Sequence, residues 1–339
     1  MHSAADFSAD FPKDFAALGS SSEVSGSDDG SDASSDAEDS DTLGRKGIFA
    51  SSQRRAYVGY CAQYFAVGIL LGGLPATTYG VFLGYLNVPG YVYATVSVIS
   101  TLPWSFKFVF GFVNDVFPIR GQRRKPYMVM GWLFCAVMLL VMYTQALPPP
   151  YWCVDEQTGE YIREHDGPDG RTAAKPCNAD ARKEGGRFGF LMMLVALGYV
   201  VADVAADGLT TEYAKMEPIE RRGSTQTTAY FMRTLGTAFS SLFVGLCMNS
   251  KLYNGSFNWG LSFNEVCLVF AIPAFMMVFV SATCVKEVKG TSQMSCVEYG
   301  RLCWDLLCSR AMFFVILNSF LSPMIGAIST PAGALVKQY

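Results

Sequence analysis

The sequence predicts an all-α protein that crosses a membrane several times. Of its 339 residues, 51% are apolar and 14% aromatic, whereas only 16% are charged. Ordinary globular proteins have about 25% charged residues. Long apolar stretches recur from residue 57 onward. This composition excludes a disordered protein, a coiled coil and a nucleic-acid-binding protein, because none of these buries so many apolar residues.

Seven apolar stretches reach the length of about 20 residues that a helix needs to cross the hydrocarbon core. They lie near residues 58–86, 92–114, 126–146, 188–211, 226–248, 262–285 and 311–335. We therefore expect a bundle of six helices within residues 51–285 and a seventh helix within residues 311–339.

Residues 1–50 precede the first stretch as an acidic tail. Residues 1–42 are rich in Asp and Glu and contain one base, Lys13. A segment so polar and charged cannot form a core, so we expect it to be disordered. Its start also lacks the basic and apolar regions of a signal peptide.

Lys and Arg concentrate in alternate loops, which indicates the orientation of the chain. Bases are frequent in the segments 44–56, 115–125, 212–225 and 286–310, and rare in the short loops 87–91 and 249–261. The positive-inside rule thus places the tail and the linker 286–310 in the cytoplasm. The long loop 147–187 is then extracellular, and we expect the membrane to be the plasma membrane.

Two features fit this orientation. Asn254-Gly255-Ser256 is a glycosylation sequon in a loop expected outside. Cys153 and Cys177 are the cysteines of the expected outside loops; they could form a disulfide or remain two free thiols.

Four charged residues lie within the expected spans: Lys107, Asp203, Asp207 and Arg233. A charge at the bilayer centre costs about 2.5–3.5 kcal/mol on insertion scales, so these side chains should pair or meet water. Asp203 and Asp207 are four residues apart and share one helix face. These charges could line a path for an ion or a substrate. Alternatively, they could form structural ion pairs that hold the helices together.

The segment 111–125, GFVNDVFPIRGQRRK, connects the second and third spans. Gly111 allows a neighbouring helix to approach, Asp115 can hold an arginine, and Gly121 belongs to the turn. Arg123 and Arg124 lie at the level of the headgroups. The segment predicts a gating loop, although the basic cluster alone would also serve as a positive-inside anchor.

Several stretches together resemble the folate–biopterin transporter family of the major facilitator superfamily. They are GGLPATTYGVFLGYLNV (72–88), LPWSFKFVFGFVNDVFPIRGQRRKPYMVMGW (102–132), ADVAADGLTTEYA (202–214) and QTTAYFMRTLGT (226–237). The resemblance covers residues 57–285. It implies a secondary active transporter, specifically a proton symporter, that moves folate- or pterin-like organic anions by alternating access.

The resemblance also suggests roles for individual residues. Lys107 or Arg233 would receive the carboxylates of a folate as charge-assisted partners. Trp104 or Tyr230 would stack on the flat pteridine ring. Asp203 and Asp207 would carry protons; the only histidines, His2 and His165, lie outside the expected spans.

The chain departs from the family pattern in its number of helices. The family has about twelve helices in two halves, whereas this sequence contains one six-helix half and a seventh helix. We expect an incomplete chain; otherwise a second half or a homo-oligomer would complete it. The alternative functions are a non-transporting receptor or regulatory half-molecule, or an inactive fragment.

Enzymatic motifs do not support a catalytic role. The sequence contains no His-Glu-x-x-His and no Gly-x-Ser-x-Gly segment. We therefore expect no enzyme activity, no cofactor and no metal, and we expect the partners to be a small anion, protons and membrane lipid rather than nucleic acid.

Overall fold

The computed structural model describes residues 35–155, 159, 161–162, 176–215, 223–285, 287 and 295–326, with the backbone alone for residues 35–54, 323 and 326. The chain divides into two units, Met1–Lys289 and Gly290–Tyr339. Residues 1–34 of the expected tail, His165 and the end of the expected seventh span lie outside the described residues.

The first unit is built from helices. Its α-helices are α1 (Ser35–Thr78), α2 (Gly90–Ser105), α3 (Lys107–Val116), α4 (Lys125–Thr144), α5 (Gly185–Ala214), α6 (Ser224–Cys247) and α7 (Phe263–Thr283). A π-helix, η3 (Tyr79–Tyr85), continues α1, and two short 3-10 helices, η4 (Ala179–Glu184) and η6 (Lys251–Tyr253), lie in loops. Strands β1 (Cys153–Val154) and β2 (Tyr161–Ile162) form a small antiparallel pair.

Helix α1 begins earlier than the sequence analysis expected. It starts at Ser35, so residues 35–50, which were assigned to a disordered tail, are helical.

The second expected span, 92–114, is two helices. Helix α2 contains Pro103 and ends at Ser105, and Phe106 has φ −100° and ψ 13° before α3 starts at Lys107. Proline removes a backbone donor and crowds the preceding turn, which is the usual cause of a helix break. The break places Lys107 in the first turn of a new helix.

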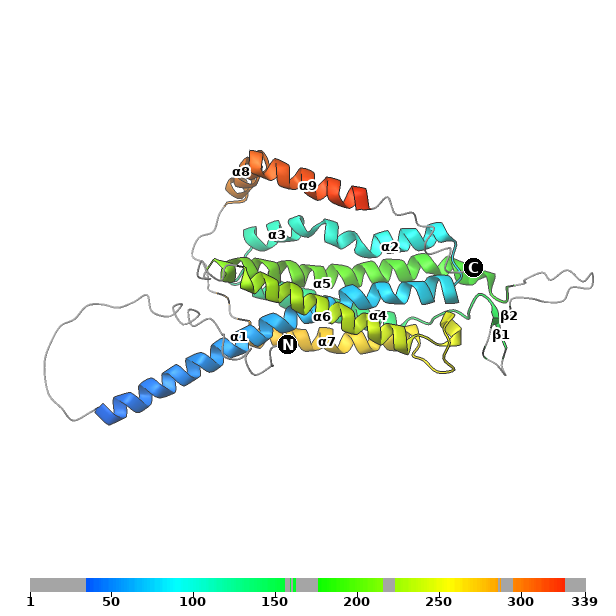
Figure 1. Ribbon diagram of the computed structural model, residues 1–339, viewed down its shortest axis with the longest axis horizontal. Helices are drawn as coiled ribbons and strands as arrows, with labels where there is room; N and C mark the ends of the chain where they lie inside the picture. Colours follow the sequence, from blue (N-terminus) through cyan, green and yellow to red (C-terminus); the bar gives the residue numbers. More distant parts are fainter. Residues whose placement is uncertain are drawn as a thin grey trace, which may run out of the picture. The chain divides into compact units, whose positions relative to one another are not determined.

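Helix α5 is the centre of the bundle and packs against α1, α2, α3, α4 and α6 (Figure 1). Glycines bring the helices close together. A Cβ atom at Gly68 or Gly72 of α1 would meet backbone atoms of α6, and one at Gly198 of α5 would meet Cys135 of α4.

The interior holds large aromatic residues and a small polar network. Trp132, Phe82, Phe188 and Phe263 are fully buried, as is Gln63. The Trp132 indole N–H donates to Gln63 Oε1 at 2.5 Å, and Gln63 Nε2 donates to Ser281 Oγ at 2.5 Å. This network ties α1, α4 and α7 together, because each buried polar group needs a partner.

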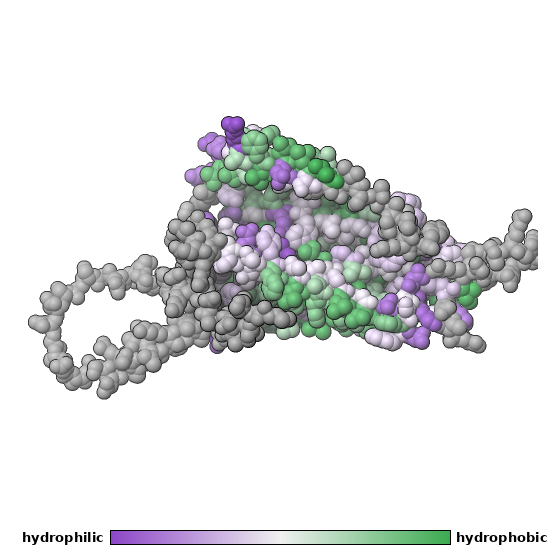
Figure 2. Space-filling model, in the orientation of Figure 1, coloured by the Kyte–Doolittle hydropathy of each residue, from purple (hydrophilic) through white to green (hydrophobic). Residues whose placement is uncertain are grey.

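The outer faces are apolar, as expected of helices in lipid. Apolar surface extends over the region of α6 and α7 in the space-filling view (Figure 2). Exposed residues on these helices include Phe239, Leu242, Phe275, Met276 and Phe279.

Among the described residues, five helical segments are long and apolar enough to cross a membrane. They are Arg55–Tyr85, Gly90–Val116, Lys125–Thr144, Ala179–Ala214 and Phe263–Thr283, and the bent pair α8–α9 would make a sixth. An all-α polytopic membrane protein is therefore confirmed, but the expected count of seven spans is not. Helix α6 occupies the fifth expected span and falls short, because Thr, Ser, Gln226 and Arg233 lower its hydropathy.

The second unit contains α8 (Cys296–Leu307) and α9 (Arg310–Gly326). The two helices meet at an angle of 73°. Helix α9 matches the start of the expected seventh span.

Candidate functional site

The four charges of the expected spans meet in one cluster. Lys107 comes from the start of α3, Asp203 and Asp207 from α5, and Arg233 from α6. Lys107 Nζ pairs with Asp203 Oδ2 and lies 2.8 Å from Asp207 Oδ2. The Arg233 guanidinium lies 2.6 Å from Asp203 Oδ1 and 3.4 Å from Asp207 Oδ1. Two cations thus face two carboxylates, and the fully ionised cluster is neutral.

The two carboxylates differ in their access to water. The Asp203 side chain is 0% exposed and has a cation at each oxygen, whereas the Asp207 side chain is 45% exposed. Lys107 is 26% exposed and Arg233 15%. Asp203 is therefore the buried counter-ion, and Asp207 and Lys107 form the accessible side of the cluster.

Two tyrosines of α1 complete the surroundings of Asp207. The Tyr64 hydroxyl donates to Asp207 Oδ1 at 2.9 Å and lies 2.6 Å from Thr210 Oγ1. The Tyr60 hydroxyl lies 3.0 Å from the same threonine oxygen. The sequence analysis missed these three residues. Their signal was available, because Tyr60 and Tyr64 are four apart on an apolar helix and share a face.

Aromatic rings border both cations. Lys107 Nζ lies 4.4 Å from the ring centroid of Trp104, whose indole N–H donates to the Tyr199 hydroxyl at 3.1 Å. The Arg233 guanidinium lies 5.0 Å from the ring of Tyr64 and 5.7 Å from that of Tyr230. A cation over an aromatic face is stabilised by the ring quadrupole. Both rings that the sequence singled out, Trp104 and Tyr230, therefore border the cluster.

Close helix packing helps to position Arg233. A Cβ at Gly68 would meet the Arg233 carbonyl, and Thr237 Oγ1 donates to the Gly68 carbonyl at 3.2 Å. Helices α1 and α6 can approach this closely because Gly68 has no side chain. Within the part of the chain that the structure describes, Arg233 Nε is buried without a hydrogen-bond partner. The guanidinium thus retains a donor for a further acceptor.

A second charged group lies where α3 connects to α4. Arg124 lies 2.5 Å from Asp115 and 3.7 Å from Glu212 of α5. Gly121 takes φ +75° in the turn, a conformation that side chains disfavour. Gly111 lies on α3 and faces α5. A Cβ atom at Gly111 would lie 3.7 Å from a methyl group of Val204. The predicted loop residues therefore bring together α3, α4 and α5.

Glu287 holds this loop from the far end of the first unit. Its carboxylate accepts hydrogen bonds from the backbone N–H groups of Arg123 at 2.6 Å, Arg124 at 3.0 Å and Lys125 at 2.9 Å. These N–H groups belong to the start of α4, where unsatisfied donors and the helix dipole favour an anion. The sequence placed Glu287 in a linker and predicted no role for it.

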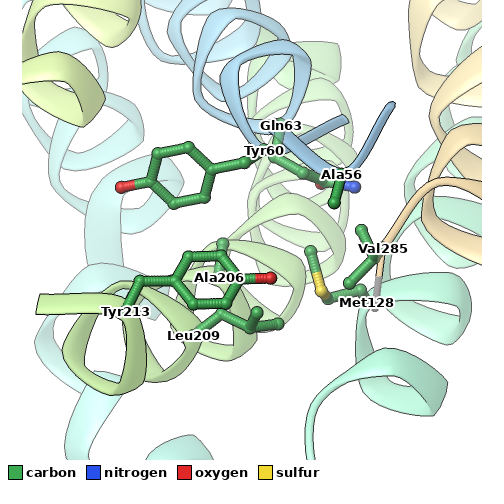
Figure 3. A pocket seen from close by; sticks show the side chains of 8 residues that line it. All are labelled: Ala56, Tyr60, Gln63, Met128, Ala206, Leu209, Tyr213 and Val285. Atoms are coloured by element: carbon green, nitrogen blue, oxygen red, sulfur yellow. The ribbon is translucent and has the colours of Figure 1, made fainter. Parts of the chain in front are cut away.

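A small pocket, with room for little more than one water molecule, lies near this end of the bundle (Figure 3). It is lined by Ala56, Tyr60, Gln63, Met128, Ala206, Leu209, Tyr213 and Val285. The rings of Tyr60 and Tyr213 flank it, and Met128 and Val285 close another side (Figure 3). Its lining is mostly apolar and excludes the four clustered charges, so it does not suit a charged ligand.

The loops expected outside are also described in part. Cys153 and Cys177 form a disulfide with a Cα–Cα distance of 5.1 Å. Asn254 follows η6, is exposed and has φ +65°. The side chain before it, Tyr253, is buried, and this burial raises the pKa of its hydroxyl to about 12. Among the described residues, no group of three or more His, Cys, Asp or Glu side chains is placed to hold a metal ion.

Comparisons with known proteins agree with the resemblance. The model of the BT1 family matches residues 67–147. A protein of Arabidopsis thaliana named "Probable folate-biopterin transporter 4" is 21% identical over 152 residues, 45% of this chain. The match spans about a quarter, 24%, of that relative's length. No solved structure matches the chain at a significant level.

The matched region contains part of the geometry described above. Residues 67–147 include Trp104, Lys107, Asp115 and Arg124. Together with the apolar helices, these similarities indicate an integral multi-pass membrane protein that is similar to transporters. Over part of its length the chain is therefore similar to the BT1 family and to a protein named as a folate–biopterin transporter.

Proposed function

We propose that the protein takes part in secondary active transport of folate- or pterin-like organic anions, with the proton as coupling ion. The observation that carries this proposal is the neutral cluster with one buried and one accessible carboxylate. The name of the Arabidopsis relative supports the substrate class. The six helices of residues 51–285 would form one half of an alternating-access transporter of the major facilitator type.

In this proposal, proton binding and substrate binding are coupled because the substrate anion and the Asp207 carboxylate compete for Lys107. In the ionised cluster each cation already faces carboxylates, so an arriving anion finds no free positive charge. Protonation of Asp207 would remove the negative charge 2.8 Å from Lys107 and leave Lys107 and Arg233 to share Asp203, so the cluster would carry one net positive charge. The groups that face Asp207 are Lys107 from α3, Arg233 from α6, Tyr64 from α1 and Asp203 from its own helix. One proton on Asp207 would thus accompany one substrate carboxylate bound at the cluster.

The remaining residues would bind and orient the substrate. A carboxylate held by Lys107 would lie beside Trp104, on which a flat pteridine could stack. Tyr230 is 55% exposed and offers a second ring beside Arg233. The contacts of Asp115, Arg124 and Glu212 would close the cytoplasmic side and open when the helices move.

Uptake measurements test this proposal. The complete protein is placed in vesicles, and accumulation of labelled folate or pterin is followed with and without an imposed inward proton gradient. We expect the gradient to raise uptake by the intact protein and to have no effect on Asp207→Asn. Asp180→Asn is the matched control, because Asp180 lies on the exposed surface and pairs only with Lys183 among the described contacts.

Two results would contradict the proposal. If accumulation of the labelled substrate is unchanged both by the proton gradient and by Asp207→Asn, the protein transports without proton coupling. Saturable binding without accumulation would indicate a receptor or regulatory role instead.

The proposed orientation, with a cytoplasmic N-terminus in the plasma membrane, is tested at Asn254. If the loop is extracellular, the protein from secretory cells should carry a glycan that glycosidase removes. Asn254→Gln should then migrate like the deglycosylated protein. An unglycosylated wild-type protein would leave the orientation without this support.

A further inference from the structure

Helix α8 of the second unit has two sharply different faces. Its charged residues Glu298, Arg301 and Asp305 are spaced by three and four, which places them on one strip of the helix. The rest of the circumference is apolar or aromatic, with Val297, Leu302, Cys303, Trp304, Leu306 and Leu307. Such a division between a narrow charged strip and a broad apolar face is typical of a helix at an interface between water and an apolar phase.

The apolar face is exposed in the structure. Helix α8 has no buried residue, and Val297, Leu302, Trp304, Leu306 and Leu307 are each about half exposed or more. The helix begins in an ordered way, because Ser295 accepts a hydrogen bond from the Glu298 N–H. An apolar surface of this kind is stable only when lipid or another protein surface shields it from water.

Helix α9 indicates that lipid shields the apolar face of α8. Its residues 311–326 contain no charge, and its 17 residues extend about 26 Å at 1.5 Å each. This is close to the hydrocarbon thickness of about 30 Å, so α9 can cross the membrane without help from α8. Helix α8 joins α9 at 73°, which places α8 near the membrane plane when α9 crosses it.

We propose that α8 is a membrane-surface helix. It lies in the cytoplasmic headgroup region with its apolar face toward the acyl chains and its charged strip toward water. Trp304 suits this depth, because its ring is apolar and its N–H is polar. The strip contains two acids and one base, so binding depends on the apolar face and does not require anionic lipid.

The competing arrangement is a single broken span made of α8 and α9. It would carry the charged strip of α8 into the hydrocarbon, where charged side chains are strongly disfavoured. The proposal is independent of what the protein transports, since it concerns only the second unit.

Spin-label depth measurements test the position of α8. The full-length protein is prepared with its free cysteines replaced, and single cysteines are then placed along α8. Cys303 is retained to report on the apolar face, and Arg301→Cys, two residues away, is the matched reporter on the charged strip. Leu306→Cys and Asp305→Cys repeat the comparison, so that failure of one variant leaves a second pair.

We expect a periodic result in vesicles of zwitterionic lipid. Labels at 303 and 306 should collide more often with lipid-soluble oxygen than with a water-soluble nickel complex, and labels at 301 and 305 should show the reverse. Equal access to the nickel complex at all four sites would place α8 in water and overturn the proposal. Access to oxygen at all four sites would indicate a broken span, and low access to both reagents at 303 and 306 would indicate a protein cover; either result would also overturn it.

Discussion

Removing the Asp203 carboxylate should destabilise the protein more than removing that of Asp207. Asp203 is fully buried, and its two oxygens face Lys107 and Arg233. Loss of one partner from a buried ion pair costs about 3–5 kcal/mol, because a charge is left without compensation. We expect Asp203→Asn to lower the free energy of unfolding by about this amount. Asp207→Asn should cost about 1–2 kcal/mol, because water reaches the 45% exposed side chain.

Thermal unfolding of the purified protein measures this difference. At about 2–4 °C per kcal/mol for a chain of 150–250 residues, Asp203→Asn should lower the Tm by roughly 10 °C, and Asp207→Asn by a few degrees. Adding Lys107→Met to Asp203→Asn restores the balance between one cation and one carboxylate. The double variant should therefore be more stable than the two single effects predict, by about 1–3 kcal/mol.

Two results would refute this reasoning. An Asp203→Asn protein as stable as Asp207→Asn would show that burial does not distinguish the carboxylates. Strict additivity with Lys107→Met would show that the ion pair contributes no coupling.

Three further predictions concern packing and the loops. Gly68→Ala should lower the free energy of unfolding by about 1–3 kcal/mol, because its Cβ would meet the α6 backbone; Gly245→Ala, which meets no atom within 4 Å, should be neutral or stabilising in the same melting assay. Glu287→Gln should cost about 1 kcal/mol by weakening the anion at the start of α4; a Tm unchanged from wild type would contradict that role. Replacing Cys153 and Cys177 together by Ser should cost about 3 kcal/mol, as expected for a bridge across 24 residues, and alkylation of the unreduced wild-type protein at these thiols would show that the bond is absent.

The sequence by itself determined the class of the protein and most of the site. Apolar length predicts membrane helices because the thickness of the bilayer is known. Charge in an apolar span is costly, which singles out Lys107, Asp203, Asp207 and Arg233 without any structure. The spacing of the two aspartates also places them on one face of a helix.

Only the tertiary structure decided which helices meet. Periodicity reports the face of a helix but not its neighbour, so the sequence could not show that α1 contributes Tyr64 to Asp207. The break at Phe106, which brings Lys107 to both aspartates, was also missed. Glu287 lies 162 residues after Lys125, and nothing local in its loop predicts a contact so distant in the chain.

The different exposure of Asp203 and Asp207 also depends on the assembled bundle. Asp203 and Asp207 have the same chemistry and lie one turn apart, yet one is enclosed and the other meets water. The difference arises from the way the neighbouring helices cover α5, and no property of either residue in the sequence records it.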